Sequence, residues 1–164
     1  MYKRQADSYL PELAEADQII SLAAIQAALK AADVERIKPQ ALIVRTLPNS
    51  TRKKTATYEP ESAPAFFSVQ AMQAIIDTGI EHLLVDLPSV DRMHDEGLLT
   101  NHHAFWNIPP GTHELTSGTK TNKTITEMIF VEQSIQDGTY LLNLQVPPLA
   151  TDAAPSRPVI FELI

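Results

Sequence analysis

Two short apolar runs, separated by a helical pattern, constrain the fold of this chain more than any other feature. ALIVR at residues 41–45 has the length and composition of a strand that is buried on both faces, and HLLVD at 82–86 is predicted as the following strand. Between them, apolar residues recur at helical spacing in a segment that Ser68 starts and Gly79 ends. Strand, crossover helix and strand make a βαβ unit, so the two strands are predicted to run parallel in one sheet. The fold class is therefore α/β.

The segments around this unit have weaker but readable patterns. Ser21 is predicted to cap a helix that continues to about Ala32. Residues 47–64 hold three prolines and many Ser and Thr, which predicts a long irregular connection of the kind that is often functional. Residues 98–106 are predicted as a short helix, and 107–123 as a second loop.

The C-terminal part is predicted to consist of strands. ITEMIFV at 125–131 and TYLLNLQV at 139–146 flank a turn at Asp137-Gly138, which predicts a β-hairpin between these two runs. PVIFELI at 158–164 is predicted as a last strand after a loop. The sheet is therefore expected to be mixed, with a βαβ unit and a C-terminal β-hairpin.

The composition of the chain narrows the class of protein and the kinds of partner that it can bind. A chain of 164 residues, 44% hydrophobic and 20% charged, is long enough for one domain with its own core. Its net charge of -7 argues against binding nucleic acid, and the one basic cluster, Arg52-Lys53-Lys54, lies in a polar stretch where a solvated loop is expected. Lys3 and Arg4 precede no apolar run, and no run of 18 apolar residues occurs, so neither a secretory signal nor a membrane span is predicted.

The absence of cysteine removes disulfides, thiolate zinc sites and cysteine nucleophiles together. Any metal must then be held by His, Asp or Glu. A chain without cysteine is compatible with a reducing compartment, and we expect a cytoplasmic protein.

The carboxyl end of the 82–86 strand carries a polar turn. In open parallel sheets ligands bind at this end of the strands, which makes Asp86, Ser89 and Asp91 candidate lining residues of a site. The alternative is that Ser89 and Asp91 serve only as turn and helix-entry residues. Residue type alone leaves both interpretations open.

All five histidines fall between residues 82 and 113. His102 and His103 are neighbours, so on a helix they point about 100° apart and are poorly placed to bind one ion together. No two histidines have the i, i+4 spacing of a helical zinc site, so further ligands must come from elsewhere in the fold. A lone histidine here is also compatible with a purely structural role.

Glu127 is the most informative acidic residue. It alternates with Ile125 and Ile129 on one side of a predicted strand whose other side is also apolar, so burial is expected. A buried carboxylate is costly unless it is paired, hydrogen-bonded or bound to a metal. The alternative is an edge strand with Glu127 in water.

Several segments together resemble the cyclase family of metal-dependent hydrolases, which includes bacterial kynurenine formamidase. They occur in order from about residue 17 to the C-terminus: ALIVRTLPN (41–49), GIEHLLVDLPSVDR (79–92), NHHAFW (101–106), ITEMIFV (125–131), DGTYLLNLQVPPL (137–149) and DAAPSRPV (152–159). The resemblance implies a swivelling β/β/α fold and a divalent metal site, with zinc expected in preference to manganese. It also implies hydrolysis of small amides, cyclic amides or esters.

The resemblance also implies which residues bind the metal. The family's pattern of His, a basic or polar residue and Ala matches His102 rather than His103, and its later strand glutamate matches Glu127. GTHE at 111–114 imitates the family's main motif, His-x-Gly-Thr-His-x-Asp, but lacks its first His and its Asp and lies after His102. His94, His103 and His113 are therefore not expected to be ligands.

No counterpart of His-x-Gly-Thr-His-x-Asp precedes residue 41. The expectation is that residues 1–164 form one domain that is the C-terminal part of a larger cyclase-like fold, with the general base outside it. Such a chain should bind metal weakly, so that its site is often vacant, and should form a homo-oligomer or pair with a complementary N-terminal chain. The alternative to an enzyme is a truncated or split remnant that acts only as a binding or assembly module.

Overall fold

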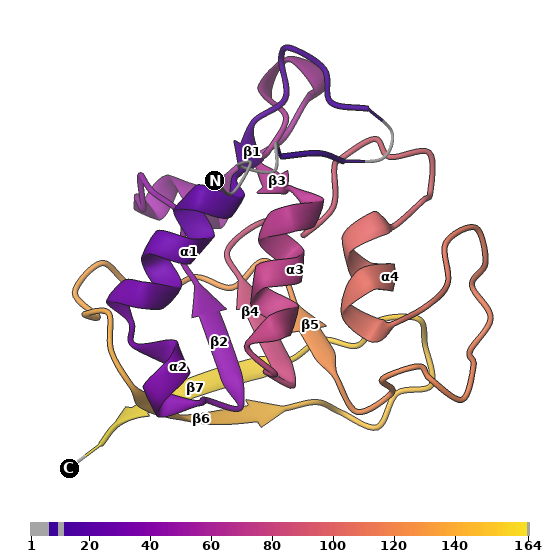
Figure 1. Ribbon diagram of the computed structural model, residues 1–164. Coiled ribbons are helices and arrows are strands. Elements are labelled where there is room, and N and C mark those ends of the chain that lie inside the picture. The colour runs from indigo at the N-terminus through magenta and orange to yellow at the C-terminus, as the bar shows by residue number, and fades with distance from the viewer. Residues whose placement is uncertain (1–6, 10–11, 164) are drawn as a thin grey trace, which may run out of the picture.

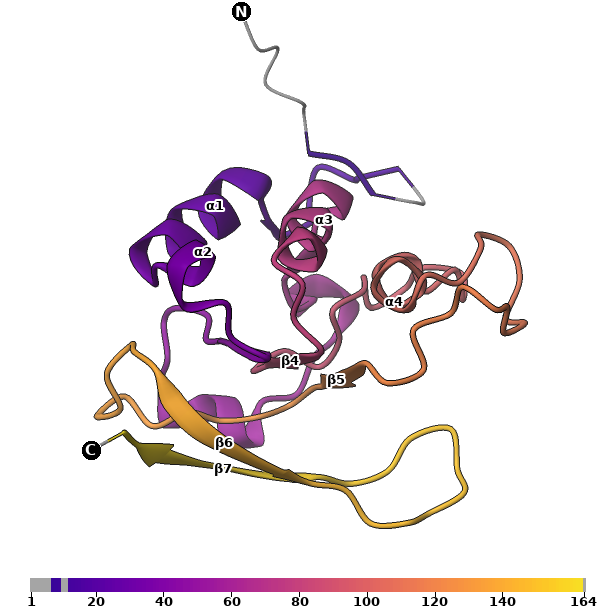
Figure 2. The same ribbon diagram turned by 60° about the horizontal axis from the view of Figure 1, so that its bottom comes forward.

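The structure is a computed structural model that describes residues 7–9 and 12–163. The N-terminal residues Lys3 and Arg4, and Ile164 at the end of the last predicted strand, lie outside the described residues. The α-helices cover one face of a three-stranded sheet and a β-hairpin crosses the other face (Figures 1 and 2). The helices are α1 (Leu22–Ala31), α2 (Val34–Ile37), α3 (Val69–Asp77), α4 (Thr100–Trp106) and the 3-10 turns η1 (Thr51–Thr55) and η2 (Pro60–Ser62). The strands are β1 (Ile19–Ile20), β2 (Ala41–Val44), β3 (Phe66–Phe67), β4 (His82–Val85), β5 (Thr124–Thr126), β6 (Tyr140–Gln145) and β7 (Arg157–Glu162).

The parallel sheet has the order β2-β4-β5. Leu42 lies beside Leu83, and Leu84 beside Thr126, in parallel register. This confirms the predicted βαβ unit and the mixed α/β class. The short parallel pair of β1 and β3 was not predicted, since each strand has only two residues.

Serine caps begin the two longer helices as predicted. The Oγ of Ser21 accepts a hydrogen bond from the backbone N–H of Ala24 (3.3 Å), and that of Ser68 accepts one from Ala71 (3.1 Å). The buried core consists of one face of α3 packed with β4, part of α1 and Phe105 of α4.

The two predicted strands of the βαβ unit differ in burial. β4 lies in the middle of the sheet, and Leu83, Leu84 and Val85 are fully buried. β2 is an edge strand and is only half-buried along its length. The prediction that both faces of 41–45 are buried is therefore wrong, because the apolar run does not reveal which strand has a neighbour on each side.

The predicted hairpin between 125–131 and 139–146 is also wrong. β5 ends at Thr126, and Met128 has a positive φ of 57°, which interrupts the extended backbone. β6 pairs with β7 instead, antiparallel from Tyr140 beside Glu162 to Gln145 beside Arg157. The C-terminal hairpin exists, but with a different partner.

Arg45 explains why Asp137-Gly138 is not a hairpin turn. Its guanidinium donates to the backbone carbonyls of Glu132 and Ile135 (3.1 and 3.0 Å) and to the carboxylate of Asp137 (2.7 Å). The loop between β5 and β6 is thereby fastened to the end of β2. β6 then continues away from β5 to the opposite layer.

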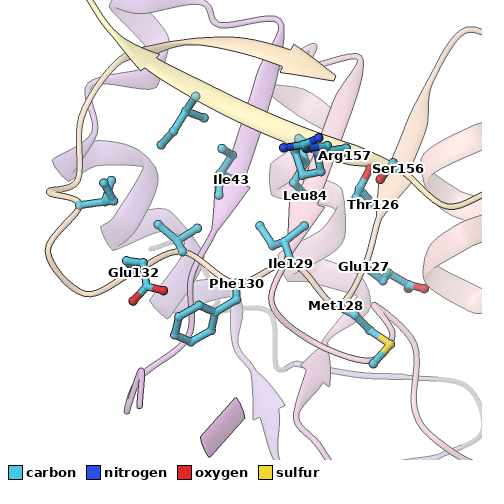
Figure 3. A pocket seen from close by; sticks show the side chains of 14 residues that line it. Ile43, Leu84, Thr126, Glu127, Met128, Ile129, Phe130, Glu132, Ser156 and Arg157 are labelled. Carbon is cyan, nitrogen blue, oxygen red and sulfur yellow. The ribbon is translucent and has the colours of Figure 1, made fainter. Parts of the chain in front are cut away.

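A cleft of about 440 Å³ lies between the parallel sheet and the inner face of the hairpin (Figure 3). Its walls are mainly apolar and come from Ile43, Leu84, Ile129, Phe130, Val131, Ile135, Pro158 and Ile160. On the outer face of the hairpin two large apolar side chains are exposed, Leu141 by 61% and Phe161 by 51%.

In the basic cluster of the 47–64 connection, Arg52 and Lys54 are exposed, as expected for a solvated loop, whereas Lys53 is half-buried. Lys53 forms an ion pair with Asp86 (2.6 Å), and Lys54 forms one with Glu132 (2.7 Å). Within the described residues, no helix has the length and apolar character that a membrane span requires.

Candidate functional site

The site is centred on His102, which α4 places beside the segments that follow β4 and β5. Its Nδ1 lies 2.5 Å from Oδ2 of Asp91, and its Nε2 lies 3.4 Å from Oε1 of Glu127. The two carboxylates therefore lie at opposite ring nitrogens. The imidazole packs against Trp106, with 5.3 Å between the ring centroids, and 14% of the His102 side chain is exposed.

Glu127 lies just after the end of β5, not within a strand. Its Oε1 accepts a hydrogen bond from the backbone N–H of Val90 (2.8 Å), and 26% of its side chain is exposed. The sequence left burial within a strand and exposure on an edge strand both open; Glu127 is instead half-buried and lies one residue after the end of β5. Glu127 also lines the cleft, with its carboxylate directed away from the apolar walls (Figure 3).

Asp91 is buried, and both its oxygens accept hydrogen bonds. Oδ1 accepts from the hydroxyl of Tyr9 and the backbone N–H of Asn101, both at 2.7 Å. Oδ2 accepts from the backbone N–H of His102 (3.2 Å) and from its Nδ1. Burial raises the pKa of Asp91, but the hydrogen bonds from His102, Tyr9 and Asn101 outweigh it, so the pKa lies below its ordinary value.

The charge state of His102 follows from the same contacts. Burial lowers its pKa, whereas the hydrogen bonds to Asp91 and Glu127 stabilise the imidazolium and raise the pKa to about 9. Without a metal, His102 is thus protonated at neutral pH and linked to a carboxylate on each side.

Of the other predicted lining residues, Asp86 and Ser89 make contacts of a different kind. The carboxylate of Asp86 accepts hydrogen bonds from the backbone N–H and Oγ1 of Thr46 and from Nζ of Lys53. The Oγ of Ser89 accepts from the backbone N–H of Asp91 (3.1 Å), which is the turn chemistry of the alternative interpretation.

The remaining histidines of the window lie apart from the His102–Glu127 pair. His103 is buried and makes an edge-to-face contact with the exposed His113, with 5.1 Å between the centroids. Burial and the neighbouring His113 lower the pKa of His103. His94 is exposed, and the GTHE segment at 111–114 lies in the loop after α4.

The donor set of the pair suits a divalent cation. An imidazole nitrogen whose other ring nitrogen is held by a carboxylate, beside a second carboxylate, is a common combination at zinc sites. Asp91 faces the opposite nitrogen and is not placed to share an ion with Nε2. In the part of the chain that the structure describes, no group of three or more His, Cys, Asp or Glu is arranged to hold a metal. Among the described residues, His102 and Glu127 are thus a pair of donors of the type that divalent cations bind, and no third such donor joins them.

Two residues of this region were not found from the sequence. Tyr9 lies in an N-terminal segment without a helical or alternating pattern, 82 residues from its partner Asp91. Lys53 belongs to a run of three basic residues that looked solvated. A buried acid such as Asp86 requires a partner, but the sequence does not indicate which lysine supplies it.

Comparison with known proteins supports one family. No curated protein matches the chain. The family model described as "putative cyclase" matches residues 6–92, which is more than half of the chain. The match includes the βαβ unit, Asp86 and Asp91, and it ends before His102 and Glu127. The chain thus belongs to the putative cyclase family.

Proposed function

We propose that this chain contributes to a metal-dependent hydrolase that cleaves small amides, cyclic amides or esters, similar to kynurenine formamidase. The observation that carries the proposal is the approach of His102 Nε2 and Glu127 Oε1 to 3.4 Å, although the residues are 25 positions apart. These two side chains would hold one divalent cation, zinc in preference to manganese. Family membership supports an enzyme of this kind.

In this proposal two side chains bind the cation, and two other groups hold those side chains in position. His102 offers Nε2 because Asp91 holds Nδ1, and Glu127 offers a carboxylate that Val90 keeps in place. A bound divalent cation supplies Lewis acidity toward a carbonyl oxygen and lowers the pKa of water. The apolar cleft beside Glu127 is of the size that encloses a small molecule. Its walls would exclude water from the apolar part of a bound substrate.

The absence of a third ligand among the described residues favours a second candidate function. A site with two protein ligands needs a further segment, for which a chain bearing His-x-Gly-Thr-His-x-Asp is the expected source. Without it, the fold would serve as a non-catalytic binding or assembly module. Both proposals predict a soluble partner or small-molecule ligand and no nucleic acid.

Hydrolysis of formanilide, with Zn²⁺ and a chain carrying that motif, separates the two functions. The enzyme proposal expects amide hydrolysis that Glu127→Gln abolishes, whereas Glu114→Gln, in an exposed loop, leaves the rate unchanged. A rate that Glu127→Gln does not alter would remove Glu127 from the mechanism. Absence of hydrolysis under all these conditions favours the non-catalytic module.

A further inference from the structure

We infer that Tyr9 and Asp91 are positioning residues for His102, which fix the ring so that Nε2 presents its lone pair toward Glu127. The inference rests on the proposed function and deepens it, since it assigns roles to two side chains that touch neither substrate nor cation. The two carboxylates determine which nitrogen of the neutral His102 ring carries the proton. Asp91 lies 2.5 Å from Nδ1 and Glu127 lies 3.4 Å from Nε2, so the proton of the neutral ring is held at Nδ1.

Hydrogen bonds at both oxygens fix the orientation of the Asp91 carboxylate. Its Oδ1 is held by Tyr9 and by the backbone N–H of Asn101, which leaves Oδ2 directed at His102. Asp91 is 2% exposed, so water does not compete for these oxygens. Rotation of the carboxylate would break hydrogen bonds at both oxygens, and buried acceptors without partners are costly.

The Tyr9 hydroxyl is itself held in one direction by its contacts. Its oxygen accepts a hydrogen bond from the backbone N–H of Arg92 (3.1 Å), so its own hydrogen is directed at Asp91. The Tyr9 ring is 3% exposed and packs edge-to-face on Phe66, with 4.8 Å between the centroids. The phenol is thus fixed from both ends.

The residues before Tyr9 are held in place by hydrogen bonds to the starts of two helices. The Asp7 carboxylate accepts from the backbone N–H of Leu22 and from the Oγ of Ser68, at the starts of α1 and α3. The carbonyl of Ser8 accepts from the backbone N–H of Val69 (2.9 Å). Contacts on both helices therefore hold Tyr9 against Asp91.

The test compares Tyr9→Phe, which removes only the hydroxyl, with Tyr140→Phe. The Tyr140 hydroxyl donates to the carbonyl of Gln136 (2.7 Å) in the loop before β6, so its loss is a matched control. We expect Tyr9→Phe to weaken Zn²⁺ binding by about tenfold and Asp91→Asn by about a hundredfold, as for other residues that orient a ligating histidine. Tyr140→Phe should leave the Kd unchanged. A Kd of Tyr9→Phe within about twofold of the control overturns the inference.

A second measurement needs neither metal nor activity. In metal-free protein at about pH 10.5, where the ring is neutral, ¹⁵N shifts of His102 report which nitrogen carries the proton. We expect the Nδ1–H tautomer alone in the wild type and a mixture of both tautomers in Asp91→Asn. A wild-type ring protonated on Nε2, or one that populates both forms, overturns the inference. If the wild type binds no Zn²⁺ even with a chain bearing His-x-Gly-Thr-His-x-Asp, the proposed function fails, and the ¹⁵N shifts alone decide whether Asp91 positions the ring.

Discussion

The Nε2 of His102 lies 3.4 Å from the Oε1 of Glu127, while the other nitrogen of the same ring is bonded to Asp91. One imidazole thus bridges two acidic side chains from different parts of the chain. This bridge makes proton binding and metal binding at His102 mutually exclusive.

Stability of the metal-free protein is expected to fall as the pH rises from 6.5 to about 9. The folded-state pKa of His102, about 9, lies above the ordinary value of 6.5, so the imidazolium stabilises the fold fully below pH 6.5. Deprotonation removes this contribution, which is at most roughly 3 kcal/mol for such a shift. Urea unfolding at intervals across this range measures the loss. His102→Gln should flatten the profile, and His94→Gln, an exposed control, should not.

Zinc affinity should be low and should rise with pH. Two protein ligands leave most coordination positions to water, so protein purified without chelators is expected to be largely empty. Because zinc must displace one proton from His102, the affinity should increase about tenfold per pH unit below the pKa of about 9. Elemental analysis and competition with a chromophoric chelator measure both effects. Stoichiometric zinc that resists chelators would contradict this prediction.

The chain is expected to associate with itself through the outer face of the hairpin. Leu141 and Phe161 lie side by side across β6 and β7 and are both more than half exposed, in a two-stranded sheet that no third strand of the described chain extends. Sedimentation should show a dimer or larger species that dissociates on dilution. Phe161→Lys should shift the protein to the monomer, whereas Leu115→Lys, on an exposed loop, should not. A monomer at every concentration would rule out this assembly.

Substitution of two adjacent lysines should lower the free energy of unfolding by very different amounts. Lys53 pairs with Asp86, whose side chain is fully buried, so Lys53→Met leaves a buried carboxylate without its cation and should cost about 3 kcal/mol. Lys54 pairs with Glu132, and both side chains are about half exposed. Lys54→Met should therefore cost less than about 1 kcal/mol. Equal losses in chemical denaturation of the two variants would show that Asp86 does not depend on Lys53.

Local patterns in the sequence predicted the parts of the fold that local physics determines. Helix caps at Ser21 and Ser68, and the parallel pairing of 41–45 with 82–86, follow from spacing, capping and the handedness of crossovers. Strand partners in the C-terminal part did not follow, because alternating runs indicate strands without specifying their neighbours. The fastening of the loop at 132–137 by Arg45 depends on contacts about 90 residues apart.

The site was predicted only in part, for the same reason. His102 and Glu127 were predicted from a family resemblance, and the structure brings their side chains together. Asp91 was identified as a residue at the end of a strand, but its contact with His102 depends on how α4 packs. Tyr9 had no signal in the sequence, since a lone tyrosine in an irregular segment is compatible with almost any environment.

The attachment of the hairpin gives the molecule two levels of local stability. β4 has a hydrogen-bonded neighbour on each side and lies in the core. Within residues 7–9 and 12–163, β6 and β7 pair only with each other, and an isolated two-stranded hairpin is marginal in water. Amide hydrogens of β4 should therefore exchange with solvent only when the whole fold opens, and those of β6 and β7 through far more frequent local openings. We therefore expect the hairpin, which forms one wall of the cleft beside Glu127, to open locally while the layer that holds His102 stays folded.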